Sequence, residues 1–496
     1  MKKYLLIAAL GLALVSCAGR HEPQTHTLAV PELKPDYAGV TFAPNIAAPS
    51  FTILGEAEAW QTEIGRCGRE PAITVQSGAD GRVEIPLKKW KALLDEAKGD
   101  SIYLRFAAKG ADGSWNGATA DVVCPVSANP IDGYLVYRLL YPGYELWSSL
   151  GIYERDLSNY EQKPILENKD FDRQCVNCHN FAGNDPNLGM MVHVRGAQGG
   201  TLISIQGDVH KINSRFMGAT HGATYPGWSR DGRFIAFSAN DVGQVFHTAG
   251  KKPIEVLDKA ADLMVYNVET RTAYSDSLIS GSEWIETFPG WAPDGKRLFF
   301  CRAKAGADGE FQRPDNIKYD LCSIDFDPET GKFSNLQILY PAASRDGMTV
   351  SFPRVSPDGR WLMFTRMDYG TFSIWHPEAQ LCLMDLRTGE WREMDEVNSE
   401  SIDSYHSWSS DGKWFVFSSK RLDDLWARPY FAAFDSETGR ASKPFALPQK
   451  TAEFYDEFTR TYNIPELISS PVVNADALLH GIIGQQPLDV HLETVK

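Results

Sequence analysis

Two cysteines and a histidine near the middle of the chain, Cys175, Cys178 and His179, form the pattern C-x-x-C-H within the stretch RQCVNCHNF. Two thiols three positions apart can each add across one vinyl group of a porphyrin, and a histidine directly after the second can place its imidazole on the iron. The pattern therefore predicts one covalently bound haem c, with His179 as an axial iron ligand.

Other chemistries use the same residue types. A thioredoxin-type dithiol belongs in a βαβ unit, and a structural zinc site needs four ligands. The chain has no second C-x-x-C, and its strand signals do not alternate with helices. A disulfide or metal site at Cys175 and Cys178, or a vestigial motif, are the alternatives that remain.

The second axial ligand decides whether a haem carries electrons or binds small molecules. In the segment MMVHVRG, strand alternation puts Met191, His193 and Arg195 on one face. We predict that His193 is the sixth iron ligand, with Met191 as the next candidate, and that Arg195 pairs with a haem propionate. In the alternative interpretation, the methionines fill a core and Arg195 is a solvated charge. Three further histidines also remain open as ligands: His210, His221 and His247.

The N-terminus reads MKKYLLIAALGLALVSCAGR, with two lysines, a short apolar run and small residues before Cys17. The run is too short to span a bilayer comfortably, and the pattern is typical of a secretory signal over residues 1–16. The stretch LVSC resembles the lipobox of bacterial lipoproteins, which implies cleavage before Cys17 and acylation of its thiol. An ordinary signal peptide is the alternative. The resemblance implies a lipid-anchored protein on the periplasmic side of the cell envelope, most simply at the outer membrane of a Gram-negative bacterium.

The composition limits the partners. The formal net charge of −15 repels nucleic acid and anionic lipid, so we expect redox or envelope proteins as partners and the lipid anchor as the only membrane contact. Hydrophobic residues make up 43% of the chain, which is enough for large cores and excludes a disordered protein.

Four segments share an aromatic start, an Asp-Gly turn and a closing run of aromatic and aliphatic residues. They are YPGWSRDGRFIAFSAN from Tyr225, FPGWAPDGKRLFFCRA from Phe288, FPRVSPDGRWLMFTRM from Phe352 and YHSWSSDGKWFVFSSK from Tyr405. A second pair of strand signals follows each of them. A repeated unit of four short strands predicts a β-propeller, in which blades pack radially.

The hairpins at Ser229, Pro293, Pro357 and Ser410, with the pattern S-x-D-G or P-D-G, resemble the repeat of TolB-type propellers. The resemblance covers residues 184–448 and implies a mainly β fold. A degenerate fifth copy begins near Asn184. Strands after Tyr134, or from the C-terminal extension 449–496, would complete a sixth blade. We favour six blades, with five to seven open.

Residues 28–126 show a different sequence pattern from the repeats, with short strand signals around one amphipathic helix, LKKWKALLDEAKG. This pattern predicts a β-sandwich-like domain, joined to Cys17 by a tether over 17–27. We expect a disulfide between Cys67 and Cys124 in this domain. The segment 127–183 is interpreted as a connector that carries the C-x-x-C-H. Two further cysteines are disulfide candidates: Cys301 and Cys322.

These observations predict an extracytoplasmic, lipid-anchored haem c protein that transfers single electrons and uses the propeller as a docking scaffold. The alternative is a TolB-like binding propeller of the envelope, in which the haem is structural or sensory. A haem enzyme needs an acid or base beside an open iron site, and the sequence shows no sign of one. The chain also has no G-x-S-x-G, H-E-x-x-H or P-loop. We therefore expect no catalytic residues.

Overall fold

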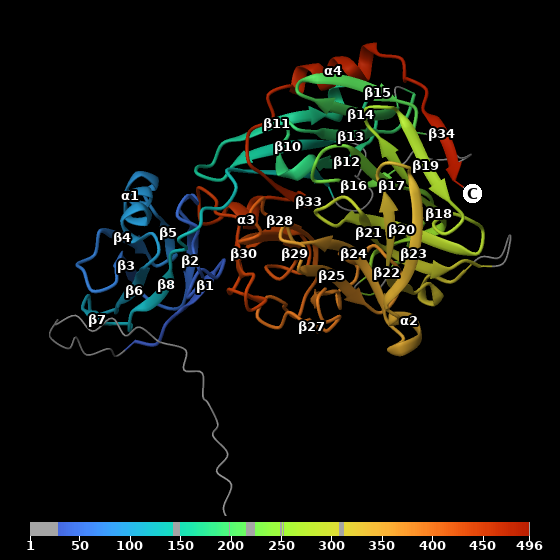
Figure 1. The fold of residues 1–496 in the computed structure, drawn as a ribbon. Coiled ribbons are helices and arrows are strands. Elements are labelled where there is room, and N and C mark those ends of the chain that lie inside the picture. Colours follow the sequence, from blue (N-terminus) through green and yellow to red (C-terminus); the bar gives the residue numbers. More distant parts are fainter. Residues whose placement is uncertain are drawn as a thin grey trace, which may run out of the picture.

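The protein is mainly β, as the sequence predicted, and Figure 1 shows a smaller N-terminal part beside a larger part built of several sheets. The signal, the tether, Cys17 and His221 lie outside the described residues. The computed structural model describes residues 28–141, 149–197, 199–214, 224–248, 250, 252–306 and 312–495.

The N-terminal part contains two sheets and one long helix. Helix α1 (Leu87–Ala97) buries Trp90, Leu93 and Leu94, which share one face at helical spacing. The indole of Trp90 donates a hydrogen bond to the carbonyl of Ile46 at 3.1 Å and fixes the helix on the sheets. The strands are β1 (Glu32–Lys34), β2 (Ser50–Leu54) and β5 (Arg82–Glu84) in one sheet, and β3 (Ala59–Arg66), β4 (Ile73–Gly78), β6 (Ser101–Lys109), β7 (Trp115–Ala118) and β8 (Val122–Pro125) in the other.

The disulfide expected between Cys67 and Cys124 is not formed. Strand β6 separates them: the amide of Cys67 donates to the carbonyl of Ser101, whereas Cys124 pairs with Ile102 on the other edge of β6. Two strand spacings amount to roughly 10 Å, and a disulfide needs Cα atoms within about 7 Å.

The other two disulfide candidates are free thiols. Cys301 lies opposite Leu321 on the neighbouring strand, so the side chain of Cys322 points to the other face of that sheet. Two thiols on opposite faces of one sheet cannot bond without breaking the strand pairing.

After the N-terminal part, the described strands form six sheets of four or five strands each. The first three are β11 (Gln162–Glu167), β10 (Leu150–Asp156), β9 (Tyr134–Leu140) and β33 (Thr461–Ile468); β12 (Val176–Phe181), β13 (Met190–Val194), β14 (Gly200–Ile205) and β15 (Asp208–Ile212); and β16 (Thr224–Trp228), β17 (Phe234–Phe246), β18 (Ile254–Asn267), β19 (Thr272–Asp276) and β34 (His491–Val495). The next three are β20 (Trp284–Trp291), β21 (Arg297–Lys304), β22 (Tyr319–Asp327) and β23 (Lys332–Tyr340); β24 (Thr349–Val355), β25 (Trp361–Met367), β26 (Gln380–Asp385) and β27 (Trp391–Glu393); and β28 (Asp403–Trp408), β29 (Trp414–Ser419) and β30 (Arg428–Asp435), whose partners are β31 (Arg440–Ala441) and β32 (Phe445–Ala446).

Three helices lie among or after these sheets: α2 (Ala342–Arg345), α3 (Phe454–Glu457) and α4 (Ala475–Gly484). In Figure 1, α4 covers the β14 and β15 end of one sheet, which agrees with its contacts.

The segment 127–183, interpreted from the sequence as a connector, instead supplies strands β9 to β12. Strand β9 pairs with β33 near the C-terminus, so one sheet combines two distant segments of the chain. The sequence suggested that strands after Tyr134, or from the C-terminal extension 449–496, would complete a sheet. In the structure both segments contribute strands to it. Strands β10, β11 and β12 were not predicted, because residues 150–181 carry no Asp-Gly turn of the kind that marks the repeats.

Six strands, one from each sheet, lie next to one another and are called the inner strands: β12, β16, β20, β24, β28 and β33. Successive members of this set contact each other from β12 to β33. Each contains a bulge at which one non-glycine residue takes a positive φ and the register with the next strand shifts. The bulge residues are Cys178, Tyr225, Phe288, Phe352, Tyr405 and Ile464. The stretch CHNF of the haem motif therefore occupies the place that YPGW takes in a repeat.

The N-terminal part packs on the sheet of β28 to β32 (Figure 1). The rings of Phe42 and Phe445 lie 5.6 Å apart, and the indole of Trp414 donates a hydrogen bond to the carbonyl of Asn129 at 3.1 Å.

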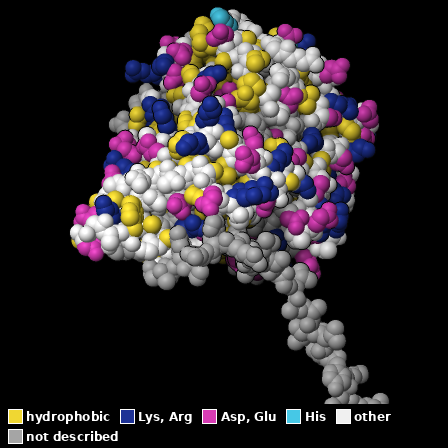
Figure 2. All heavy atoms as spheres, turned by 90° about the vertical axis from the view of Figure 1, so that its left-hand side faces the viewer, with side chains coloured by type: hydrophobic (Ala, Val, Ile, Leu, Met, Phe, Trp, Pro, Cys, Tyr) yellow, Lys and Arg dark blue, Asp and Glu magenta, His cyan; other side chains and the backbone are white. Residues whose placement is uncertain are grey.

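The face of the molecule on the side of the N-terminal part carries positive and negative side chains without a large area of one sign (Figure 2). This face is therefore a mixed polar surface.

The inner strands approach one another closely two residues after each bulge. A Cβ atom on Gly227 would lie 2.5 Å from the carbonyl oxygen of Pro289, and one on Gly290 would lie 2.5 Å from that of Pro353. Contacts this short are not seen for real side chains, so glycine is required at both positions by the neighbouring strand.

We predict that Gly290→Ala lowers the free energy of unfolding by about 1–3 kcal/mol, because the new methyl group must push two inner strands apart. Denaturant unfolding monitored by circular dichroism measures this. The matched control is Gly133→Ala, since a Cβ there meets no atom within 4 Å. Equal stability of the two variants would contradict the close packing of the inner strands.

Candidate functional site

The three residues of the C-x-x-C-H motif line one cavity of about 170 Å³ at one end of the inner strands. Cys178 sits at the bulge of β12 with φ of 54°, which lets the strand turn Cys178 and His179 toward the cavity. Bulge residues of other inner strands, among them Tyr225 and Tyr405, line the same cavity. The tertiary structure thus places the motif where several sheets meet.

His179 is buried, with 3% of its surface exposed, and neither ring nitrogen makes a hydrogen bond of good geometry within the described residues. Burial, together with the charge of Arg138, lowers the pKa of His179 to about 3, against a smaller opposing effect of backbone groups of Ile464 and Val136. The imidazole is therefore neutral and has a lone pair to give, which is the state that a metal ligand needs.

Cys175 and Cys178 are both free thiols and both buried. Burial raises the pKa of each thiol, and the nearby Arg138 and Arg195 act in the opposite direction. The Nε of Arg195 is buried without a hydrogen-bond partner among the described residues. Two unpaired thiols, an unpaired imidazole and two cations at one cavity match the groups that hold a haem c with its propionates.

The cavity is smaller than a whole porphyrin. Its volume is close to the about 150 Å³ of a cavity that accepts a benzene ring. Aromatic side chains of Phe372 and Trp375 form part of its lining. A bound haem would therefore extend beyond the cavity or displace these side chains.

The structure brings only part of the segment MMVHVRG to the motif. Arg195 lines the cavity, and its amide donates to the carbonyl of Cys175 at 2.9 Å. Met191 is fully buried in a core with Trp228, as in the alternative interpretation of the methionines. A methionine held in this core does not reach the cavity.

His193 lies directly opposite Asn177, a lining residue, but does not itself line the cavity. It is 4% exposed, and its Nδ1 lies 3.0 Å from the hydroxyl of Thr201. His210 and His247 are exposed and also lie outside the lining. Among the described lining residues, His179 is the sole histidine and there is no methionine.

A long hairpin forms one wall of the cavity. Strands β17 and β18 have 13 and 14 residues, and Val242, Gln244 and Val256 from their far halves line the cavity. An ion pair of 2.8 Å between Lys252 and Glu378 joins the end of the hairpin to the segment just before β26. No pattern recognised in the sequence predicted this wall. The available signal was the unusual distance between the Asp-Gly turn at Gly232 and the next strand pair.

Other site types find no support within the described ranges. Within these ranges, no three or more histidine, cysteine, aspartate or glutamate side chains lie together in a group that could hold a metal ion. None of the helices described is both long enough and apolar enough to cross a membrane.

No protein-family model matches the chain. A curated relative is an uncharacterized protein of Agrobacterium fabrum, 23% identical over 174 residues, which are 30% of this chain and 53% of that protein. The chain thus spans about half the length of the curated relative that it matches.

Solved structures that resemble the chain include propeller proteins. A structure described as TolB from Agrobacterium tumefaciens is 16% identical, with 64% of this chain and 89% of that chain covered and a TM-score of 0.38. An oligogalacturonate lyase in complex with manganese is 12% identical, with 62% and 84% covered and a TM-score of 0.32. The periplasmic gluconolactonase PpgL of Pseudomonas aeruginosa is 14% identical, with 66% and 99% covered and a TM-score of 0.32. Likenesses at this level carry no information about activity.

Proposed function

We propose that this protein is an extracytoplasmic haem c protein that transfers single electrons, with its six sheets acting as a TolB-like propeller scaffold. The observation that carries the proposal is the meeting of an unpaired, neutral His179 with two free thiols, Cys175 and Cys178, at one buried cavity. A haem c bound there would supply one-electron redox chemistry.

The chain's own residues have distinct parts in this proposal. Cys175 and Cys178 tether the group covalently, and His179 provides one axial ligand. Arg138 and Arg195 line the cavity and would pair with the propionates. The hairpin of β17 and β18 forms one wall of the cavity and would shield the bound group from water on that side. An electron carrier is proposed in preference to a haem enzyme, because the sequence shows no sign of an acid or base beside an open iron site.

The six sheets are proposed to be six blades. The contacts between successive inner strands support this arrangement, as does the bulge that each inner strand has at the same place. In this arrangement β33 from the C-terminal segment provides the inner strand of the blade that begins with β9 to β11. A blade shared between distant segments ties the two ends of the propeller together.

The location is proposed to be the periplasmic side of the cell envelope, most simply the outer membrane, with Cys17 acylated. The partners would be redox or envelope proteins and not nucleic acid, because the net charge of −15 repels a polyanion.

The alternative function is a TolB-like binding propeller whose haem is structural or sensory. A potential titration separates them, since an electron carrier must be reversibly reduced and an inert haem would favour the alternative.

The double variant Cys175→Ala, Cys178→Ala should lose covalent haem and keep its fold, because neither thiol joins two sheets. Haem staining after denaturing electrophoresis and circular dichroism measure the two properties. The matched control is Cys382→Ala, a buried cysteine of β26 outside the cavity lining, which should keep its haem. Covalent haem on the double variant would refute the assignment.

The sixth ligand can be tested at His193. In the described arrangement its Nδ1 lies 3.0 Å from the hydroxyl of Thr201 and its ring is not part of the cavity lining, so His193→Ala should leave the spin state of the ferric haem unchanged. Absorption spectra in the visible and near infrared measure the spin state. Conversion to high spin would show that His193 leaves Thr201 and binds the iron, as the sequence suggested.

The anchor can be tested at Cys17. Cys17→Ser should move the protein from the membrane fraction to the soluble periplasmic fraction, because acylation is the proposed membrane contact. Fractionation followed by immunoblotting measures this, with Cys67→Ser as the control that should stay in the membrane fraction. Retention of the Cys17→Ser protein after a salt wash would count against the lipid anchor.

A further inference from the structure

A second cavity, called the axial pocket, opens two residues beyond the bulges of the inner strands. Its volume is about 130 Å³, and it lies at the other end of these strands from the cavity of the haem motif. The residues two positions after each bulge line it: Asn180, Gly227, Gly290, Arg354, Ser407 and Glu466. Neither the sequence patterns nor the proposed electron transfer gives this pocket a role.

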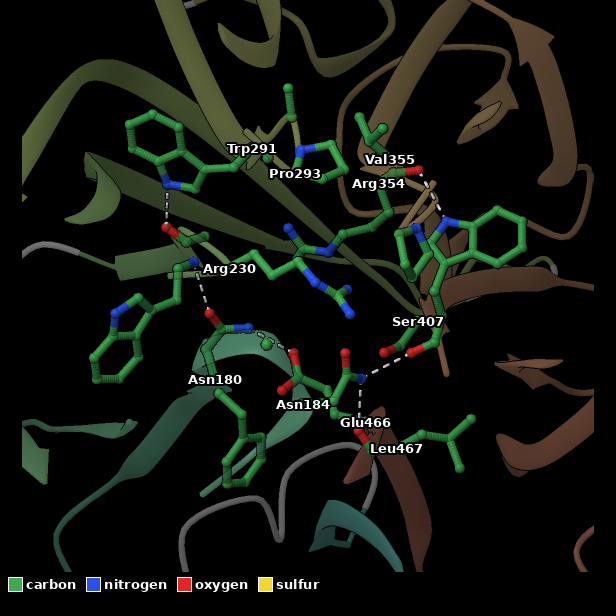
Figure 3. Close-up of a pocket in the computed structure, with 18 residues that line it drawn as sticks. Asn180, Asn184, Arg230, Trp291, Pro293, Arg354, Val355, Ser407, Glu466 and Leu467 are labelled. Atoms are coloured by element: carbon green, nitrogen blue, oxygen red, sulfur yellow. Dashed lines mark hydrogen bonds between the residues drawn. The ribbon is translucent and has the colours of Figure 1, made fainter. Parts of the chain in front are cut away.

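Two guanidinium groups enter the axial pocket. Arg354 stands where two of the other repeats have glycine, and Arg230 comes from the turn after β16. Figure 3 shows both side chains projecting into the pocket from different sheets. Their hydrogen bonds go to backbone carbonyls, from Arg354 to Pro289 at 3.3 Å and from Arg230 to Ser410 at 2.9 Å. Carbonyl oxygens do not neutralise the positive charges.

One carboxylate faces them. Glu466 is 7% exposed and accepts a hydrogen bond of 2.8 Å from the amide of Asn180. Burial raises the pKa of Glu466 to about 7, although Arg354 and Asn180 both act to lower it. The lining of the pocket thus holds two guanidinium groups and one carboxyl group, so it has a net positive charge even when Glu466 is ionised. Asp132, whose charge interacts with that of Arg230, lies outside the lining and accepts hydrogen bonds from the backbone amide and the hydroxyl of Ser410.

The walls set the size and shape of what can enter. The indoles of Trp291 and Trp408 donate to the carbonyls of Gly227 and Arg354, at 2.9 and 3.1 Å, and hold flat apolar walls around the charged centre. A volume near that of a cavity which accepts benzene admits a molecule of about six non-hydrogen atoms. The pocket thus combines positive charge, a hydroxyl from Ser407 and apolar walls in a small space.

We propose that the axial pocket binds a small organic monocarboxylate, whose carboxylate accepts charge-assisted hydrogen bonds from Arg354 and Arg230. Guanidinium groups match the planar geometry of a carboxylate. The short carbon chain of the ligand would lie against the tryptophan walls. A dianion such as phosphate is disfavoured, because Glu466 would repel its second charge and the apolar walls would offer it no hydrogen bonds.

Isothermal titration calorimetry of the full chain with lactate and acetate, and separately with inorganic phosphate, tests the proposal. We expect saturable binding of the carboxylates and weaker binding of phosphate. Arg354→Gln should weaken lactate binding about tenfold or more, since it removes a charge-assisted hydrogen bond. Glu466→Gln should strengthen lactate binding severalfold, because it removes the negative charge that opposes the ligand.

Two further variants keep the test decisive. Arg230→Gln changes an exposed residue at the pocket, so it should fold normally and still weaken lactate binding severalfold. Arg313→Gln removes an exposed arginine that lies outside the pocket lining and should bind lactate as the native protein does. Absence of saturable lactate binding, equal affinity of native and Arg230→Gln proteins, or tighter binding of phosphate than of lactate would each overturn the proposal.

Discussion

The bulge in each inner strand is the constraint on which the rest of this structure depends. At each bulge a non-glycine residue adopts a positive φ, a conformation that costs on the order of 1 kcal/mol or more and persists only where packing supports it. The register shift beside the bulge changes the direction in which the following side chains point. The inner strands can then lie close enough that Gly227 and Gly290 admit no Cβ. The cavity of the C-x-x-C-H motif and the axial pocket are both lined by residues at or next to these bulges.

Strand β12 connects the two cavities. His179 lines the cavity of the haem motif, and the next residue, Asn180, lines the axial pocket and donates a hydrogen bond to Glu466. The amide oxygen of Asn180 also accepts from the backbone of Trp228 at 2.9 Å on the neighbouring inner strand. The position of His179 is therefore determined by hydrogen bonds on the far side of its own strand. An imidazole on a strand held in this way would suit the proposed role of His179 as an axial ligand.

Several features could be predicted because they depend on local chemistry. The Asp-Gly turns and the alternating runs after them identified four repeats, since a tight turn and a half-buried strand have local signatures. The strand CVNCHNF was not recognised as an inner strand, because it has none of the aromatic-Pro-Gly-Trp pattern of YPGW. The disulfide between Cys67 and Cys124 failed for another reason: spacing along the chain does not reveal that β6 lies between the two cysteines.

The sequence by itself determined the kinds of groups present: two thiols and an imidazole at C-x-x-C-H spacing, and a repeated strand unit. Covalent spacing is a local property, so it can be read without a fold. Only the tertiary structure decided what surrounds those groups. It placed Arg195 in the lining of the cavity and His193 outside that lining, although strand alternation predicted one face for both, and it brought Arg354 and Glu466 to one pocket from strands more than a hundred residues apart. Burial and unsatisfied hydrogen bonds depend on packing between sheets, and no pattern along a single chain segment specifies that packing.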